Sequence, residues 1–168
     1  ASVRTGKCIL KEIEERETSR NPAAPFTTST LQQESSNKLG FSVKRTMAVA
    51  QQLYEGIEVE GETRGLITYM RTDSVRVADE AITEVRQQID QHYGGEYVPE
   101  VANQYKTKNS AQDAHEAIRP TSVALDPAKV KDLLSQDQAR IYELIWKRFV
   151  ASQMKPLVLS ITTVNIEA

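Results

Sequence analysis

The segment 135–154, SQDQARIYELIWKRFVASQM, has the pattern of one amphipathic helix and constrains the fold more than any other stretch. Ser135 and Gln138 have the spacing of a capping box, which satisfies free N–H groups where a helix begins. The residues that recur with helical spacing on one face are Ile141, Ile145 and Phe149. Pro156 stops the helix, and the tail LVLSITTVNIEA after it predicts a strand.

Upstream signals predict further helices. Ser29 and Ser42 are expected to cap two of them, and Gly40, Gly56 and Gly94 are expected to follow helix ends. The expected helices cover about 29–39, 43–55 and 78–93, with a short one that begins at Asp126-Pro127. The apolar stripe predicted for the second helix consists of Val43, Met47, Ala50 and Tyr54.

Strand-like arms flank this helical block. The sequence predicts an arm over 1–27, a helical domain over 28–155 and a returning arm over 156–168. Within the helical domain, 57–65 reads as a loop or small hairpin and 66–70, LITYM, as a short buried strand. Two arms alone are too thin to bury a face, so we expect them to belong to a neighbouring sheet. The predicted class is α+β, mainly helical with short β arms.

Composition bounds the class of protein. The 168 residues carry a net charge of −2, so there is no basic excess over the whole chain, although a local patch can still bind DNA. Cys8 is the single cysteine, which excludes an intrachain disulfide and fits a reducing compartment. One cysteine and two histidines do not favour a zinc site, and no apolar run approaches membrane-spanning length. Because the chain begins without methionine, we expect a piece of a longer protein.

The run GLITYMRTDS places reactive groups close together. On an extended segment Tyr69 and Arg71 share a face, so a phenol and a permanently charged guanidinium can address one anion. Asp73 has the same parity and can orient Arg71, and Thr68 and Ser74 offer hydroxyls to a nucleic-acid backbone. The alternative is a core tyrosine whose hydroxyl bonds a nearby carbonyl. These residues alone do not decide between the two.

GLITYMRTDS resembles the active-site tyrosine motif of type IA DNA topoisomerases, the bacterial topoisomerase I group in particular. PAAPFTTSTLQQESSNKLGFS upstream and SAQDAHEAIRPT downstream resemble two further segments of that family, in the same order. Numbered along the chain, the first motif is 22–42, the second is GLITYMRTDS at 65–74 and the third is 110–121. The resemblance covers about residue 10 to 168. It implies a winged-helix-like helical tyrosine domain whose flanking strands belong to an arch-like β domain.

The resemblance also implies a reaction. Tyr69 would attack a phosphodiester of single-stranded DNA and form a 5′-phosphotyrosyl intermediate, and Arg71 would stabilise the scissile phosphate. Strand passage and resealing would then relax negative supercoils without ATP. The alternative that we keep is a catalytically silent single-stranded DNA-binding module on the same scaffold.

The third motif contributes further candidates. His115 is expected to contact DNA near the cleavage site, or else to be a surface histidine. Arg119 is a candidate phosphate or partner-domain contact, the alternative being an exposed ion pair with Glu116, and Glu116 can instead hold His115 or Arg119 in place. The hydroxyl-rich start of TTSTLQQES can bind a phosphate at a helix N-terminus, although plain capping is the simpler interpretation.

The family also uses Mg²⁺, held by an acidic cluster of a toprim domain. A D-x-D signature of that domain is not found in this sequence, so Mg²⁺ is expected to bind outside it. The implied partners are single-stranded DNA, negatively supercoiled duplex DNA and the toprim and other domains of the same polypeptide, with no membrane. The implied location is the cytoplasm, at the nucleoid. The chain alone is expected to fold but not to cleave DNA efficiently.

Overall fold

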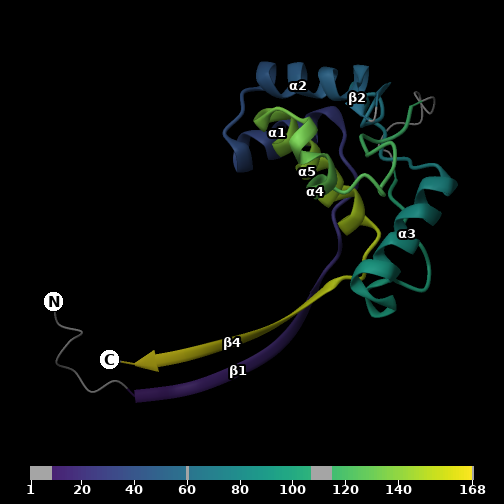
Figure 1. Cartoon of the computed structure of the whole chain (residues 1–168). Coiled ribbons are helices and arrows are strands. Elements are labelled where there is room, and N and C mark those ends of the chain that lie inside the picture. Colours follow the sequence, from purple (N-terminus) through teal and green to yellow (C-terminus); the bar gives the residue numbers. More distant parts are fainter. Residues whose placement is uncertain (1–8, 60, 107–114, 168) are drawn as a thin grey trace. The chain divides into compact units, whose positions relative to one another are not determined.

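The computed structural model describes residues 9–59, 61–106 and 115–167. Cys8 and residues 110–114 of the third motif lie outside this part. The chain divides into two compact units, one formed by Ala1–Asn21 with Pro156–Ala168 and the other by Pro22–Lys155 (Figure 1). Helices and small sheets occur together, which confirms the α+β class. None of the described helices combines the length and the apolar character needed to cross a membrane.

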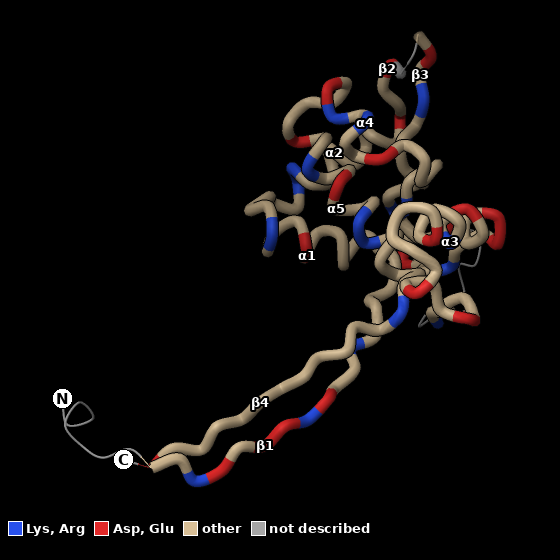
Figure 2. The backbone as a smooth tube through the Cα atoms, turned by 60° about the horizontal axis from the view of Figure 1, so that its bottom comes forward, with Lys and Arg blue, Asp and Glu red and all other residues tan. Residues whose placement is uncertain are grey.

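The first unit is an antiparallel ribbon of β1 (Ile9–Arg20) and β4 (Leu157–Glu167). The strands pair along their whole length, with one irregularity between Leu10 and Glu12. Charged residues are concentrated on β1, whereas most of β4 is uncharged (Figure 2). Apart from half-buried Ile161, the side chains of both strands are exposed, so this ribbon encloses no core of its own.

The second unit is built around three helices, α1 (Thr28–Leu39), α2 (Val43–Glu55) and α5 (Gln136–Ser152), which contact one another (Figure 1). The other helical elements are α3 (Asp79–Tyr93), η2 (Gly95–Tyr97), α4 (Pro127–Val130) and η3 (Lys131–Leu133). The core-facing residues of α5 are Ile141, Tyr142, Ile145, Trp146, Phe149 and Val150. This confirms the predicted inner face, and the capping box of Ser135 and Gln138 begins the helix as expected.

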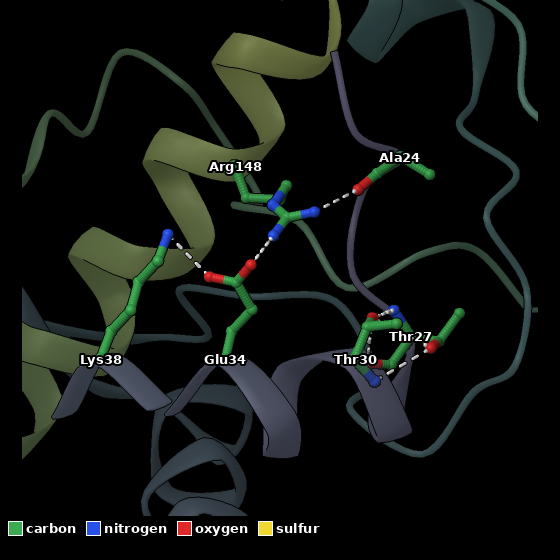
Figure 3. A network of polar contacts seen from close by, with 6 residues as sticks. All are labelled: Ala24, Thr27, Thr30, Glu34, Lys38 and Arg148. Atoms are coloured by element: carbon green, nitrogen blue, oxygen red, sulfur yellow. Dashed lines mark hydrogen bonds and ion pairs between the residues drawn. The ribbon is translucent and has the colours of Figure 1, made fainter. Parts of the chain in front are cut away.

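Helix α1 has a different N-cap from the one predicted, because Thr27 and not Ser29 occupies that position. The Thr27 side chain accepts from the Thr30 N–H, and the Thr30 hydroxyl accepts from the Thr27 N–H at 2.9 Å (Figure 3). Serine and threonine are both good caps, so the sequence did not separate neighbouring candidates. Gly40 ends the helix at φ 69°, in the left-handed region that favours glycine.

Helix α2 lies between Ser42 and Gly56 as predicted, but it buries a different stripe. Its buried residues are Thr46, Val49, Ala50 and Leu53. Val43 and Tyr54 of the predicted stripe are exposed, so that part of the prediction was wrong. Two stripes one residue apart both have helical spacing, and the packing against α1 and α5 selects between them.

A hairpin of β2 (Ile57–Val59) and β3 (Glu62–Arg64) follows α2. Of the loop and the small hairpin considered for 57–65, the structure has the hairpin. Residues 66–70 do not form the predicted strand and make only an isolated bridge, between Ile67 and Pro120. The backbone of this segment bonds to α2 and to residues 119–121 in turn, so no single partner strand aligns with it. Its buried side chains are Leu66, Ile67 and Met70.

The described part of the polar segment after α3, residues 98–106, is irregular and closes the end of α5. The Asn103 side-chain amide donates to two carbonyls there, at 2.9 and 2.8 Å. The Tyr105 hydroxyl lies 2.8 Å from the Ser152 carbonyl and 3.1 Å from the Pro22 carbonyl. These bonds hold the first and last residues of the helical unit together.

Candidate active site

Tyr69 lies on an irregular segment that α1 holds through one threonine. The Thr28 hydroxyl donates to the Met70 carbonyl at 2.8 Å and accepts from the Thr72 N–H at 2.9 Å. The Thr28 N–H in turn donates to the Thr72 carbonyl at 2.9 Å. Because Thr28 is the first residue of α1, the start of this helix fixes the backbone directly after Tyr69.

The backbone before Tyr69 is held by the third motif. The Thr68 N–H donates to the Arg119 carbonyl at 2.9 Å, and the Arg119 N–H donates to the Thr68 hydroxyl at 3.0 Å. The same hydroxyl donates to the Ala117 carbonyl at 2.7 Å. Thr68 therefore uses its side chain within the protein, to position the residue that follows it.

The first and third motifs also contact each other directly. Phe26 and Ile118 form an antiparallel bridge in which the Ile118 N–H donates to the Phe26 carbonyl at 2.8 Å. Both side chains are fully buried. The structure thus brings together the described parts of the three motifs, and Tyr69 lies where they meet.

The ring of Tyr69 is half-buried and contacts two other aromatic side chains, Tyr54 and His115. The ring centroids of Tyr69 and Tyr54 are 5.4 Å apart at an interplanar angle of 67°, and those of Tyr69 and His115 are 5.3 Å apart at 41°. Tyr54 and His115 are exposed. Within residues 9–59, 61–106 and 115–167, no group forms a hydrogen bond with the Tyr69 hydroxyl. We call Tyr54, Tyr69 and His115 the aromatic cluster.

Arg71 and Asp73 are exposed and follow Tyr69 closely. Among the described residues, Arg71 makes no hydrogen bond or ion pair, with Asp73 or with any other side chain. The structure does not bring these two together as the sequence suggested. The Arg71 guanidinium is therefore accessible to an anion from outside the described part of the chain.

Ser74 is buried and its hydroxyl belongs to a local turn. It accepts from the Arg76 N–H at 3.1 Å, and the Ser74 N–H donates to the Thr72 hydroxyl at 3.0 Å. This side chain stabilises the path of the chain after Tyr69, and it is not presented to a ligand.

Glu116 and Arg119 form a closely coupled pair. One Glu116 oxygen lies 2.7 Å from Arg119 Nη2 and accepts from Arg119 Nε at 2.8 Å, while Nη1 donates to the Pro120 carbonyl at 2.9 Å. The two side chains are only 20% and 13% exposed. The pair is therefore more buried than the exposed ion pair considered from sequence, and it braces the segment that holds Thr68.

A network of charged residues joins α5 to the first motif (Figure 3). Arg148 on α5 forms an ion pair with Glu34 on α1 and donates to the Ala24 carbonyl at 3.4 Å. Its guanidinium carbon lies 4.4 Å from the centroid of the Phe26 ring, a cation–π contact. Burial raises the pKa of Glu34, but a hydrogen bond from Lys38 and the charges of Lys38 and Arg148 outweigh it and lower the pKa overall.

Three residues of this arrangement were not singled out from sequence. Thr28 was one hydroxyl among several at a helix start, Tyr54 was assigned to a core stripe, and Arg148 was assigned no site. A sequence signal was available for Thr28, which lies within the first motif, but not for Arg148, whose helix lies outside all three motifs. Their partners are 15 to 124 residues away in the chain, which local pattern does not reveal.

Acidic residues do not gather into a metal site in the described part of the chain. No group of three or more His, Cys, Asp or Glu side chains there is arranged to hold a metal ion. The described residues thus do not fit the acidic cluster that the resemblance associates with Mg²⁺, and we assign no chemical step to a metal.

Comparison with known proteins places the chain in a family. The family model described as DNA topoisomerase matches residues 1–168. DNA topoisomerase 1 of Rickettsia felis is 47% identical over 158 residues, which cover 94% of this chain and 20% of that protein. A DNA topoisomerase 1 of Xylella fastidiosa is 49% identical over 168 residues, covering 99% of this chain and 21% of that protein.

A solved structure agrees with the same assignment. Full-length topoisomerase I from Thermotoga maritima superimposes with a TM-score of 0.79 at 47% identity, over 94% of this chain and 25% of that one. The chain spans about a fifth of the length of the curated relatives that it matches. With a family match over its whole length, this chain belongs to the DNA topoisomerase family.

Proposed function

We propose that this chain is the tyrosine-bearing module of a type IA DNA topoisomerase, in which Tyr69 attacks a phosphodiester of single-stranded DNA. One observation carries the proposal. The backbone on both sides of Tyr69 is fixed by Thr28 and Thr68, yet no described residue bonds its hydroxyl. A core tyrosine would bond that hydroxyl internally, whereas a nucleophile needs a fixed ring and a free oxygen.

The reaction is a transesterification with balanced bonds. The Tyr69 oxygen forms a bond to phosphorus, the bond from phosphorus to the 3′ oxygen breaks, and the phenol proton is transferred, in net terms, to that 3′ oxygen. The product is a 5′-phosphotyrosyl linkage and a free 3′-hydroxyl. Because one phosphodiester replaces another, the reverse attack reseals the strand without ATP, after passage of the other strand has changed the supercoiling.

Arg71 and His115 are the groups proposed to meet DNA. Arg71 is exposed and unpaired within the described residues, and a guanidinium stabilises the charge that develops on an attacked phosphate. His115 is exposed with its ring against Tyr69, so DNA that reaches the phenol also passes this imidazole. Thr68, Ser74, Glu116 and Arg119 are proposed as supporting residues, and Asp73 as an exposed neighbour of the phosphate site.

The remaining parts of the reaction are proposed to lie in other domains of the polypeptide. On the family resemblance, Mg²⁺ is bound by a toprim domain against which the helical unit, Pro22–Lys155, docks, and the ribbon of β1 and β4 is part of an arch-like β domain. The substrate proposed is negatively supercoiled DNA with a single-stranded region, at the bacterial nucleoid. The isolated chain is expected not to relax plasmid.

The test is a covalent adduct. The chain, reconstituted with the remaining topoisomerase domains, is incubated with a 5′-labelled and a 3′-labelled oligonucleotide in separate reactions. We expect label transfer only from the 3′-labelled oligonucleotide, because the fragment that keeps the attacked 5′ phosphate carries the 3′ end. Tyr69→Phe should abolish this transfer completely. Tyr93→Phe is the matched control, because Tyr93 is exposed on α3 outside the aromatic cluster. Binding of oligonucleotide without any adduct would instead favour the silent DNA-binding module.

A further inference from the structure

Few contacts fix the orientation of the Tyr69 ring. Its hydroxyl has no hydrogen-bond partner among the described residues, so only packing fixes the ring. The ring contacts available are the two within the aromatic cluster, Tyr54 and His115, besides partial packing on the core. His115 belongs to a recognised motif, but Tyr54 belongs to none. Tyr54 is thus an exposed tyrosine near the end of α2 whose ring lies against the proposed nucleophile.

The backbone at Tyr54 is joined to the segment of Tyr69. The Leu66 N–H donates to the Leu53 carbonyl at 2.8 Å, directly across the base of the β2–β3 hairpin. At Gly65 an added Cβ would lie 2.6 Å from the Tyr54 carbonyl oxygen. The backbone of Gly65 therefore packs directly against the backbone of Tyr54. The hairpin is thus closed at its base, and Tyr54 and Tyr69 are held in a fixed relation although 15 residues separate them.

We propose that Tyr54 is a positioning residue for the Tyr69 nucleophile. Its ring meets the Tyr69 ring at 67°, the edge-to-face geometry that aromatic pairs favour. This contact limits rotation of the phenol about its side-chain bonds and keeps the ring beside that of His115. It explains why α2 exposes Tyr54, 41% accessible, and does not bury it in the core. The inference rests on the proposed function of Tyr69.

Only the ring of Tyr54 is required for this role. In the described part of the chain its hydroxyl has no hydrogen-bond partner, so Tyr54→Phe keeps the edge contact and Tyr54→Ala removes it. Tyr93→Ala is the matched control, because Tyr93 is 45% exposed at the end of another helix and lies outside the cluster. General loss of stability would affect both alanine variants, whereas loss of positioning affects one.

The first measurement needs no activity. The 168-residue chain is labelled with 3-fluorotyrosine, and the Tyr69 signal is assigned by its absence in Tyr69→Phe. We expect the Tyr69 ¹⁹F resonance to move by more than its linewidth in Tyr54→Ala, and to stay within it in Tyr93→Ala. An unmoved Tyr69 signal in Tyr54→Ala would overturn the proposal.

The second measurement is single-turnover adduct formation by the reconstituted enzyme. Tyr54→Ala should slow it by about two- to tenfold, the equivalent of one aromatic pair, with oligonucleotide affinity unchanged, and Tyr54→Phe should retain the parent rate. Unchanged rates in Tyr54→Ala, or equal slowing in Tyr54→Phe, would overturn the positioning role. If Tyr69→Phe still formed the adduct, the proposed function would fail instead, while the resonance shift would still report the ring contact.

Discussion

Thr28 and Thr72 exchange a pair of hydrogen bonds that joins the start of α1 to the segment carrying Tyr69. The Thr28 N–H donates to the Thr72 carbonyl at 2.9 Å, and the Thr72 N–H donates to the Thr28 hydroxyl at the same distance. The hydroxyl-rich run at 27–30 is therefore divided between two tasks. Thr27 and Thr30 cap the helix, while Thr28 faces the neighbouring segment. Plain capping explains part of this motif, and support of Tyr69 explains the rest.

Thr28→Val should destabilise the helical unit. Valine keeps the volume but removes the partner of the Thr72 N–H and one donor to the Met70 carbonyl, and a buried unpaired group costs about 1–3 kcal/mol. Urea denaturation should show that loss, and Thr28→Ser should recover most of it. Ser29→Ala, at an exposed position, should change the unfolding free energy by less than about 0.5 kcal/mol. Equal losses at both positions would contradict this account.

Gly65→Ala should displace the Tyr69 segment. The new Cβ would lie 2.6 Å from the backbone oxygen of Tyr54, and backbone cannot yield as a flexible side chain does. Overpacking of this kind costs about 1–3 kcal/mol, and adduct formation should slow because the aromatic cluster moves. In Gly95→Ala the nearest atom is a side-chain oxygen of Asp90, at 3.0 Å, which can rotate away. If both variants unfold at the same urea concentration, the close approach is not limiting.

Much of this architecture could be predicted from local chemistry. Helices begin after Ser42 and Ser135 because these residues are good N-caps, and α1 ends at Gly40 because glycine tolerates the left-handed backbone there. The structure has these three helix boundaries where they were predicted. The inner face of α5 was also predictable, because bulky apolar residues recur from Ile141 to Val150, over almost three turns. Where two stripes compete, as in α2, only the neighbouring helices decide, and the prediction failed by one residue.

The candidate site could be predicted in part. The resemblance of motifs identified Tyr69 and His115, which the structure places in contact. The bonds that fix Tyr69 come from Thr28 and from the backbone near Arg119, and such long-range pairs leave no periodicity in the sequence. The segment 66–70 has strand composition, yet its hydrogen bonds go to several partners, so composition gave the burial correctly and the conformation wrongly.

Arg148→Met should loosen the first motif. It removes the ion pair with Glu34, the bond to the Ala24 carbonyl and the cation–π contact with Phe26. Breaking one partner of a buried pair costs about 3–5 kcal/mol, and we expect about 2–3 because Lys38 still neutralises Glu34. Lys147→Met is the matched control on the same helix, since its pair with Glu143 is 68% and 48% exposed and worth under about 1 kcal/mol. Thermal or urea unfolding distinguishes the two, and similar losses would contradict a buried network.

Acidification should weaken the same network in a defined direction. The folded-state pKa of Glu34 lies below its ordinary value of 4.5, because Lys38 and Arg148 outweigh the effect of burial. Its contribution to stability is therefore fully present above about pH 4.5 and is lost as pH falls through the folded-state pKa. The difference in unfolding free energy between the parent chain and Glu34→Gln should be constant from about pH 7 to 5 and shrink below it. Glu143→Gln, in an exposed pair, should show a much smaller difference at every pH. A difference for Glu34→Gln that grows on acidification would mean that burial dominates, and the ion pairs would then not be what holds the first motif in place.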